Sequence, residues 1–467
     1  MYCQSAKQDY TLEQIQGIRA RWISREKFKG MLREYQQALL AQMGKWVRFY
    51  ERLFSPLMTL DLMLFQRLNA DHSCDGAVSA LLGSQPADRA LAISESNSAY
   101  CQARQRLPLA VVQQSLWQAA AGLREELGTA ALWHGRQVGL LDGSTLRLEA
   151  TTALHDHYGV SRNQHGEAHW PIMHLLALFH LFTGGLEGAV EAPYVVGELS
   201  MLQPLMQTMD PHWVWVGDMN FGCYRAVQVA HAYEQDVVFR VRPSRVKGWI
   251  GTQPMLSGED RPVRWAPKEA RRVEPNLPAP AIEGRLLYLR IEQAGFRPID
   301  LYLFTTLTDP LLFPTQAIFE LYARRYNVEL NLRHLKTTLQ MEALRGKSVD
   351  IVRKEVWVGF LAYTLIRGLM GLAAVSAQLS PLGLSFVRCL RRILSAAPRL
   401  AAAHTPQLQD AWQTLLIHLA RCKLPVRKKA RFEPRQVWGK PKVFPAIKGS
   451  RNKARAAELA KQSGTLS

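Results

Sequence analysis

The sequence predicts an α/β protein in which a mixed β-sheet is flanked along the chain by helical regions. Residues 1–130 read as helices joined by short polar turns, residues 131–345 alternate apolar strands with helices, and residues 346–420 are again helical. Alternating strands and helices are typical of a mixed sheet, whereas successive amphipathic helices pack on one another. With 467 residues, of which 48% are hydrophobic, the chain can bury a large core and form about three domains.

The first helical region, residues 1–130, carries a cluster of basic side chains near its start. The cluster comprises Arg19, Arg21, Arg25, Lys27, Lys29 and Arg33. Such a face suits a polyanion, but a solvated basic helix would produce the same pattern.

The predicted sheet begins with an apolar strand that carries Asp142 near its end. Strands at residues 169–180 and 186–192 follow, joined through a Gly-Gly pair, because glycines allow the positive φ angles of a tight hairpin. The remaining elements are a helix at residues 198–209, a strand that ends in Asp218, a helix at 222–235 and a strand at 237–242. This order of elements is that of a ribonuclease-H-like fold.

Residues 243–300 interrupt this alternation. The interval is too long for a simple connection, and it contains Trp249, Trp265, several prolines and a strand-like segment at residues 285–292. We therefore expect a β-rich insertion at about residues 243–300, within a domain that continues to residue 345.

A segment after the insertion places polar side chains at a helical spacing. The side chains are Tyr322, Arg325, Glu329, Arg333 and Lys336. At about 100° of rotation per residue they share one face of a helix. A carboxylate among cations and a phenol suits a metal ion beside a phosphate chain, which suggests phosphodiester cleavage. A solvated helix with ordinary ion pairs would show the same residues.

Asp142 and Asp218 supply two further carboxylates. Each one alone is typical of a turn residue at the end of a strand. In combination with the Tyr-x2-Arg-x3-Glu-x6-Lys pattern of residues 322–336, however, they resemble the Asp-Asp-Glu transposases of bacterial insertion sequences. The pattern is similar to the signature of insertion-sequence family four.

The resemblance extends from about Ser94 to about Arg455, although the specific motifs cover a small part of that length. Residues 98–108, 306–308 and 357–367 also resemble segments of these enzymes. At Tyr326 the chain departs from many relatives, which carry Trp directly after the signature Arg.

The resemblance implies a mechanism of metal-assisted phosphoryl transfer. Asp142, Asp218 and Glu329 would hold two Mg²⁺ or Mn²⁺ ions, since carboxylate oxygens suit hard cations. Phosphates near the transposon end would be gripped by Tyr322, Arg325, Arg333 and Lys336. Relatives use their N-terminal domain to recognise the ends of the element.

An aromatic residue in the insertion of similar transposases can receive a base flipped from the transposon end. Trp249, flanked by Arg245 and Lys247, is the candidate here, and Trp265 is its rival. Stacking a base on Trp contributes roughly 1–3 kcal/mol, which suits a positioning residue. The alternative is a Trp that packs under its own hairpin.

The charge of the chain independently favours nucleic acid as a partner. The formal net charge is +19 and the sequence pI is about 9.8. Residues 421–455 contain thirteen Lys or Arg and one acid, a net charge of +12, so the tail at residues 421–467 is expected to bind phosphates or simply to aid solubility. The apolar stretch at residues 357–366 is too short to cross a bilayer, so no membrane partner is expected.

The cysteines and the N-terminus favour a cytoplasmic protein. The six cysteines form no Cys-x-x-Cys pair, which argues against zinc ribbons and a disulfide framework. The polar start of the chain lacks the blocks of a secretory signal.

The sequence therefore predicts a DNA transposase that cleaves the terminal inverted repeats of an insertion sequence and joins them to target DNA, as a homodimer during synapsis. A metal-dependent nuclease without joining activity is the nearer alternative. A non-catalytic DNA-binding protein derived from a transposase is the more distant one.

Overall fold

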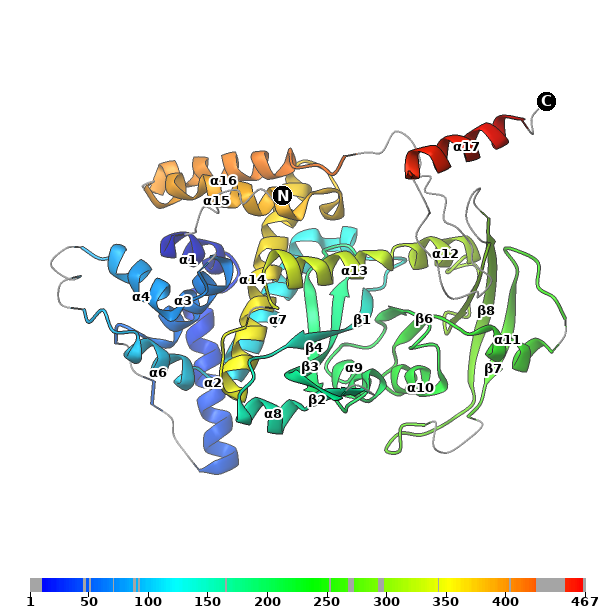
Figure 1. The fold of residues 1–467 in the computed structure, drawn as a ribbon, viewed down its shortest axis with the longest axis horizontal. Helices are drawn as coiled ribbons and strands as arrows, with labels where there is room; N and C mark the ends of the chain where they lie inside the picture. Colours follow the sequence, from blue (N-terminus) through cyan, green and yellow to red (C-terminus); the bar gives the residue numbers. More distant parts are fainter. Residues whose placement is uncertain are drawn as a thin grey trace.

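We analysed a computed structural model of the chain (Figure 1). It describes residues 11–464 except 45–47, 50–51, 70, 87–89, 91–92, 164–165, 252, 268–272, 293–297, 343, 403–404 and 426–449.

Helices form the N-terminal region, as predicted. They are α1 (Leu12–Ala20), α2 (Arg25–Met43), α3 (Pro56–Leu68), α4 (Cys74–Gly83), α6 (Ser98–Arg106), α7 (Leu109–Leu127) and the short η1 (Gly128–Ala131). The hydroxyls of Ser24, Ser55 and Ser73 accept backbone N–H groups in the first turns of α2, α3 and α4, which fixes where these helices begin. The predicted basic face is wrong in part, because Arg19 is buried in an ion pair with Asp61.

Within the described residues, nine strands form one mixed sheet. They are β1 (Val138–Arg147), β2 (Val160–Asn163), β3 (Gly166–His180), β4 (Leu186–Pro193), β5 (Val214–Gly217), β6 (Asp236–Arg240), β7 (Asp260–Trp265), β8 (Ile282–Ile291) and β9 (Ile299–Thr305). Strand β1 pairs antiparallel with β3 and parallel with β5, which in turn pairs parallel with β6. The predicted hairpin of β3 and β4 is confirmed, with Gly184 at a φ of 67° in its turn.

Two local predictions differ from the structure. Asp142 lies in the middle of β1 rather than near its end, because pairing with β3 continues as far as Arg147. The helix predicted at residues 198–209 is a 3₁₀ turn, η2 (Glu198–Met201), followed by α9 (Leu202–Met206). Pro204 lacks a backbone N–H and suits the first turn of a new helix, so the segment restarts at α9. The shorter helices α8 (Thr152–Tyr158) and α10 (Tyr224–Ala232) complete this region.

The predicted β-rich insertion begins with a helix, α11 (Pro243–Ile250), and only then forms strands. Strand β9 pairs antiparallel with β6, and β8 and β7 follow in order, so the insertion extends the main sheet at its edge.

The C-terminal part is helical, as predicted for residues 346–420, and its last helix lies within the segment predicted to be a basic tail. It contains α12 (Thr315–Ala323), α13 (Tyr326–Arg333), the π-helical turn η4 (His334–Thr338), α14 (Val349–Ser376), η5 (Pro381–Gly383), α15 (Phe386–Ala402), α16 (Thr405–Ala420) and α17 (Arg451–Gly464). Most of the predicted basic tail, residues 426–449, lies outside the described residues.

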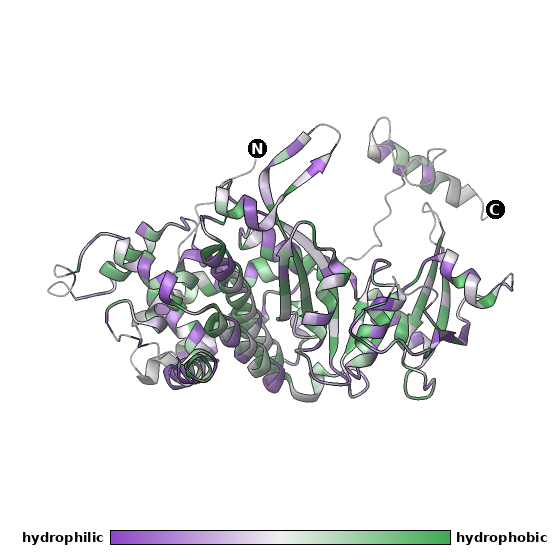
Figure 2. Ribbon diagram, turned by 90° about the horizontal axis from the view of Figure 1, so that it is seen from below, coloured by the Kyte–Doolittle hydropathy of each residue, from purple (hydrophilic) through white to green (hydrophobic). Residues whose placement is uncertain are grey.

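Helices cover both faces of the sheet (Figure 1). Buried side chains of α7, α13 and α14 share one core with Leu140 and Val216, and those of α9 and α10 share a second core with Leu141 and Trp215 on the other face. Hydrophobic residues are concentrated on the central strands, and many hydrophilic residues lie toward the outside of the molecule (Figure 2).

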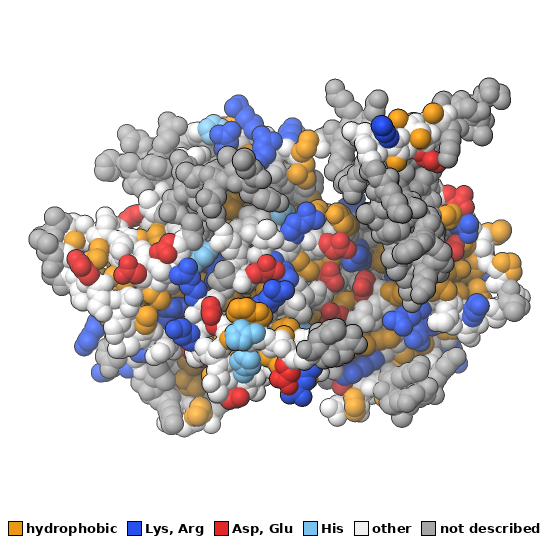
Figure 3. Space-filling model, viewed as in Figure 1, with side chains coloured by type: hydrophobic (Ala, Val, Ile, Leu, Met, Phe, Trp, Pro, Cys, Tyr) orange, Lys and Arg blue, Asp and Glu red, His pale blue; other side chains and the backbone are white. Residues whose placement is uncertain are grey.

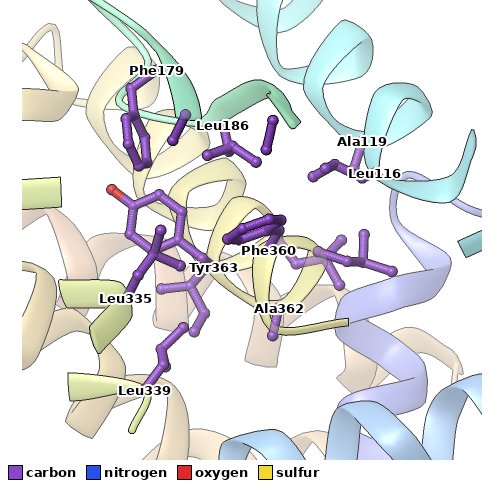
Figure 4. Close-up of a cluster of buried hydrophobic side chains, with 14 of the residues drawn as sticks. Leu116, Ala119, Phe179, Leu186, Leu335, Leu339, Phe360, Ala362 and Tyr363 are labelled. Carbon is purple, nitrogen blue, oxygen red and sulfur yellow. The ribbon is translucent and has the colours of Figure 1, made fainter. Parts of the chain in front are cut away.

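Helix α14 is the centre of the first core. Figure 4 shows Phe360 and Tyr363 of this helix between side chains of α7, of the β3–β4 hairpin and of η4. Within the described residues α14 is the one helix long and apolar enough to cross a membrane, and 89% of its most apolar window is buried inside the protein. It is longer than the apolar stretch that the sequence suggested.

Candidate active site

Neighbouring parallel strands bring the two aspartates together, as predicted, although Asp218 directly follows β5 rather than lying on it. Leu140 of β1 pairs with Val216 of β5, and Asp142 and Asp218 each follow two residues later. Leu140 and Val216 point into the core that contains α13. Because side chains alternate along a strand, β1 directs Asp142 to the same face, and the chain leaving β5 brings Asp218 beside it.

The environment of Asp142 is crowded with charge. Burial raises the pKa of the Asp142 carboxyl to about 6, the positive charge of Arg325 opposes this shift, and the negative charges of Asp218 and Glu198 add to it. Its Oδ1 also accepts the N–H of Gly143 at 3.0 Å. The fold therefore places four charged side chains from separate segments close to one another, namely Asp142, Glu198, Asp218 and Arg325.

The segment from Tyr322 to Lys336 is not one regular helix, so that part of the prediction is wrong. Helix α12 ends at Ala323, and the N–H of Arg325 bonds to the carbonyl of Tyr322 at 2.9 Å, which is the tighter i to i−3 pattern. A new helix, α13, then begins, and it passes into the π-helical η4 before Lys336. The signature side chains therefore come from three short helical pieces.

The signature side chains differ in their environments. Glu329 is exposed, and its Oε1 accepts a hydrogen bond from Nη2 of Arg325 at 2.8 Å. Burial raises the pKa of Tyr322, while the positive charges of Arg325 and Arg240 oppose that shift and the negative charge of Asp218 supports it. Tyr322 and Arg325 therefore lie close to the aspartates, and Glu329 is connected to them through Arg325.

Lys336 and Arg333 lie farther along the same segment. Lys336 is half-buried and forms an ion pair with Glu342 at 3.3 Å. Arg333 is exposed. Neither the Lys336 nor the Arg333 charge is among those that shift the pKa of Asp142. Both side chains therefore fit a role in binding DNA next to the carboxylates rather than in direct contact with them.

The C-terminal half of α13 is held by a buried cation of α14. Arg367 donates from Nη2 to Oδ1 of Asn331 and from Nε to the hydroxyl of Tyr363, each at 2.8 Å. Its guanidinium also lies over the rings of Tyr363 and Phe386. Since Asn331 is two residues from Glu329, this network determines where the Glu329 backbone lies.

The start of α12 is held by the insertion. Buried Arg285 of β8 donates to the carbonyls of Leu307 and Phe313 at 3.2 and 2.8 Å, and to the hydroxyl of Thr315 at 3.0 Å. It also forms an ion pair with Asp260 of β7. The insertion and the segment that carries Glu329 are therefore mechanically connected.

The donor chemistry fits a divalent cation, but the carboxylates are not arranged as a closed metal site. Among the described residues, no three His, Cys, Asp or Glu side chains lie close enough to hold an ion together. Asp142 and Asp218 nevertheless offer oxygen donors with like charges, which a bound cation would neutralise. Glu329 could join them on exchanging its contact with Arg325.

The candidate base-stacking residue, Trp249, lies in α11 and is half-buried. Its ring stacks on Phe304 at 5.6 Å between centroids and meets the edge of Trp265 at 4.8 Å. Trp265 is almost fully buried. One side of Trp249 borders a cavity of about 540 Å³, which Arg225, Arg245 and Arg264 also line.

The sequence reasoning missed three polar residues of this site. Arg240 lies at the end of β6 and its charge acts on Tyr322. Asn220 donates its backbone N–H to Oδ1 of Asp218 at 2.8 Å, and its side chain to Glu198 at 2.5 Å. The sequence could have indicated Arg240, because an Arg stands at the end of an apolar strand. No pattern in the sequence around Glu198 indicates that it belongs to the site.

Acidic side chains gather near the middle of one face of the molecule, close to the junction of α12 and α13, with Lys and Arg side chains around them (Figure 3). The acidic side chains of this surface suit cations, and the surrounding basic side chains suit phosphates.

Comparison with known proteins agrees with this geometry. Residues 133–365 match the family described as Transposase DDE domain. The chain is 30% identical over 147 residues to the transposase InsG of insertion sequence element IS4 from Escherichia coli (strain K12), covering 31% of this chain and 33% of InsG. It is also 30% identical over 127 residues to the putative transposase InsZ from the same strain, covering 27% of this chain and 42% of InsZ.

These matches span less than half the length of either relative. Among solved structures, a piggyBac transposase synaptic complex with hairpin DNA aligns with 89% of this chain and 87% of its own, at a TM-score of 0.41 and 9% identity.

Proposed function

Residues 133–365 belong to the Transposase DDE domain family, and from this premise we propose that the protein is the DNA transposase of an insertion sequence. It cleaves DNA strands at the terminal inverted repeats and transfers the freed ends to target DNA. The observation that supports the proposal is that Asp142 and Asp218 each lie two residues beyond the last paired residues of the adjacent parallel strands β1 and β5. The charge of Arg325 acts on Asp142, and Glu329 is bound to Arg325.

The catalytic core is ribonuclease-H-like in this proposal. The strand order β4-β3-β1-β5-β6, with β1, β5 and β6 parallel and β3 antiparallel to β1, supports it. The core spans residues 131–345 with its insertion at about 243–300. It lies between an N-terminal DNA-binding domain at residues 1–130 and helical and basic regions at residues 346–420 and 421–467.

Asp142, Asp218 and Glu329 are the catalytic carboxylates in this proposal. Their oxygens would hold two Mg²⁺ or Mn²⁺ ions, which would supply activation of a water and stabilisation of the leaving 3′ oxygen. The protein holds the scissile phosphate in line with the attacking oxygen, which contributes through positioning rather than through a covalent intermediate.

Arg325 has two partners in turn. In the free protein it binds Glu329. When DNA binds, the Arg325 guanidinium can exchange Glu329 for a phosphate, because its planar set of N–H donors matches phosphate oxygens. The Glu329 carboxylate is then free to turn toward the aspartates. Tyr322, Arg333 and Lys336 hold neighbouring phosphates and keep the strand in register.

Trp249 supplies a stacking surface for a displaced base within the insertion, on the face of the sheet opposite α13. Its half-exposed position and the three arginines around the adjacent cavity support this role. Its stacking on Phe304 also supports the structural alternative, so Trp249→Phe is the informative change: it retains an aromatic ring at reduced area.

The partners in this proposal are the two transposon ends, the target DNA and a second copy of the chain. Pairing of two ends in one complex requires two active sites, which supports a homodimer at synapsis. A cytoplasmic location follows from action on bacterial DNA.

A strand-transfer assay tests the proposal. Labelled terminal inverted repeats and a supercoiled target plasmid are incubated with the protein in Mg²⁺, and products are separated on denaturing and native gels. Nicked ends together with joined plasmid support a transposase. Nicked ends without joined products would instead indicate a metal-dependent nuclease. Bound but uncut DNA would indicate a non-catalytic DNA-binding protein.

A further inference from the structure

Glu198 begins η2 on the face of the sheet opposite α13, and its side chain reaches the backbone of β1. A Cβ built on Gly143 would overlap the Glu198 carboxyl group and lie 3.0 Å from its Cγ. The absence of a side chain at Gly143 therefore makes room for this carboxylate beside the residue that follows Asp142.

The other oxygen of Glu198 reaches the second aspartate through one intermediary. Its Oε2 accepts a hydrogen bond from Nδ2 of Asn220 at 2.5 Å, and the Asn220 backbone N–H donates to Oδ1 of Asp218 at 2.8 Å. On the first strand, the N–H of Gly143 donates to Oδ1 of Asp142 at 3.0 Å. Glu198 thus contacts the residue that bonds to each aspartate.

We propose that Glu198 is a positioning residue that ties the turn carrying Asp218 to the strand carrying Asp142, and so sets the separation of the two carboxylates. This inference rests on the proposed function of those aspartates. Strand pairing between β1 and β5 ends at Leu140 and Val216, so beyond that point no backbone ladder connects the two segments. The Gly143–Glu198–Asn220 bridge takes over where the ladder stops.

The chemistry of the bridge requires an acceptor of the right length at position 198. A side-chain oxygen at this distance from Asn220 can hold the half-buried turn through its hydrogen bond, and an amide oxygen of the same length can do the same. Outer partners of metal-binding carboxylates commonly change metal affinity by about 10–100-fold. The negative charge of Glu198 also contributes to the raised pKa of Asp142, which agrees with their proximity.

Three substitutions separate positioning from charge. Glu198→Ala removes the acceptor, Glu198→Gln keeps an acceptor oxygen and the length without the charge, and Gly143→Ala fills the space that the carboxyl group occupies. Exposed Glu125 on α7 provides the matched control, Glu125→Ala. Thermal unfolding confirms that each variant folds.

The measurement is a titration of the DNA-free protein with Mn²⁺. Electron paramagnetic resonance detects the unbound ion at each step of this titration. We expect Glu198→Ala and Gly143→Ala each to raise the Kd for Mn²⁺ by about tenfold, and Glu198→Gln and Glu125→Ala to change it by less than about twofold. The double variant should be no worse than either single one, because both remove the same bridge.

Any one of three results would overturn the positioning role. The first is a Glu198→Gln variant as weak as Glu198→Ala, since the charge itself would then matter. The second is additive losses in the double variant, and the third is unchanged affinity in Glu198→Ala. Because Mn²⁺ binding is measured without DNA, these results are independent of whether the wild-type protein cleaves terminal repeats, which the strand-transfer assay decides.

Discussion

The strand-borne and helix-borne acids of this site are held in different ways. Asp142 and Asp218 are half-buried and follow a paired register on β1 and β5. Glu329 is exposed, lies on a short helix, and is already paired with Arg325. The sheet therefore supplies a fixed half of the site, and α13 supplies a half whose carboxylate can change partner.

This difference shows that the two halves depend on different interactions. The fixed half relies on backbone pairing and the Glu198 bridge, both close to the acids. The position of α13 relies on buried Arg367 of α14 and on Arg285 of the insertion, which acts through α12. Changes to the distant cations should therefore affect Glu329 and spare the aspartates.

The largest effect is expected on removing a carboxylate charge from either half. Asp218→Asn and Glu329→Gln should each reduce strand cleavage in Mg²⁺ by about a thousandfold or more, since several kcal/mol of charge stabilisation are lost. Binding of terminal-repeat DNA should remain nearly intact in a gel-shift assay. Unchanged nicking by Glu329→Gln would refute its assignment.

Replacing Arg367 should weaken the helix-borne half selectively. Arg367→Met leaves Oδ1 of Asn331 and the Tyr363 hydroxyl without their donor, which should lower the free energy of unfolding by about 2–3 kcal/mol. Urea denaturation measures this loss. Hydrogen exchange should accelerate in α13 and stay slow in β1, and equal acceleration in both would contradict the separation of the halves.

Acid should weaken the sheet-borne half through His180. Burial, together with the positive charge of Arg124, lowers the pKa of His180 to about 3. Its Nδ1 accepts the N–H groups of Phe182 and Thr183 at 3.2 and 3.1 Å, and its Nε2 lies 2.7 Å from Oε1 of Gln137. The unfolded chain binds a proton below about pH 6.5 and the folded chain does not, so stability falls as the pH drops from 6.5 toward 3.

This loss amounts to roughly 2 kcal/mol between pH 7 and pH 5. Urea denaturation at both values measures it. His180→Gln should be less stable at pH 7 but should show a shallower pH dependence, whereas exposed His169→Gln should retain the wild-type dependence. An unchanged slope in His180→Gln would argue against this role.

The smallest effect is expected at Lys336, the proposed phosphate-binding residue that lies outside the carboxylates. Lys336→Ala should weaken binding of the transposon end by about tenfold or less and reduce the salt dependence of binding by about one ion. Glu342→Ala is the matched comparison, because it removes the competing partner of Lys336 and should tighten binding slightly. If Lys336→Ala and Glu342→Ala bind the transposon end equally well, Lys336 does not contact the DNA.

The sequence by itself was sufficient for the features that depend on local patterns. Alternating and apolar runs predicted β1, β3, β4, β5 and β6, and paired glycines predicted the hairpin. The spacing of Tyr322, Arg325, Glu329 and Lys336 pointed to Glu329 as the candidate third acid, although the single helix assumed for that spacing is broken at Arg325.

Only the tertiary structure decided how these segments combine. The helix of the signature breaks at Arg325, the insertion extends the sheet instead of forming a separate unit, and Glu198, Arg285 and Arg367 brace the site from other segments. No local pattern contains such information, because each of these contacts joins residues far apart in the chain and depends on close packing against elements that only the fold brings together.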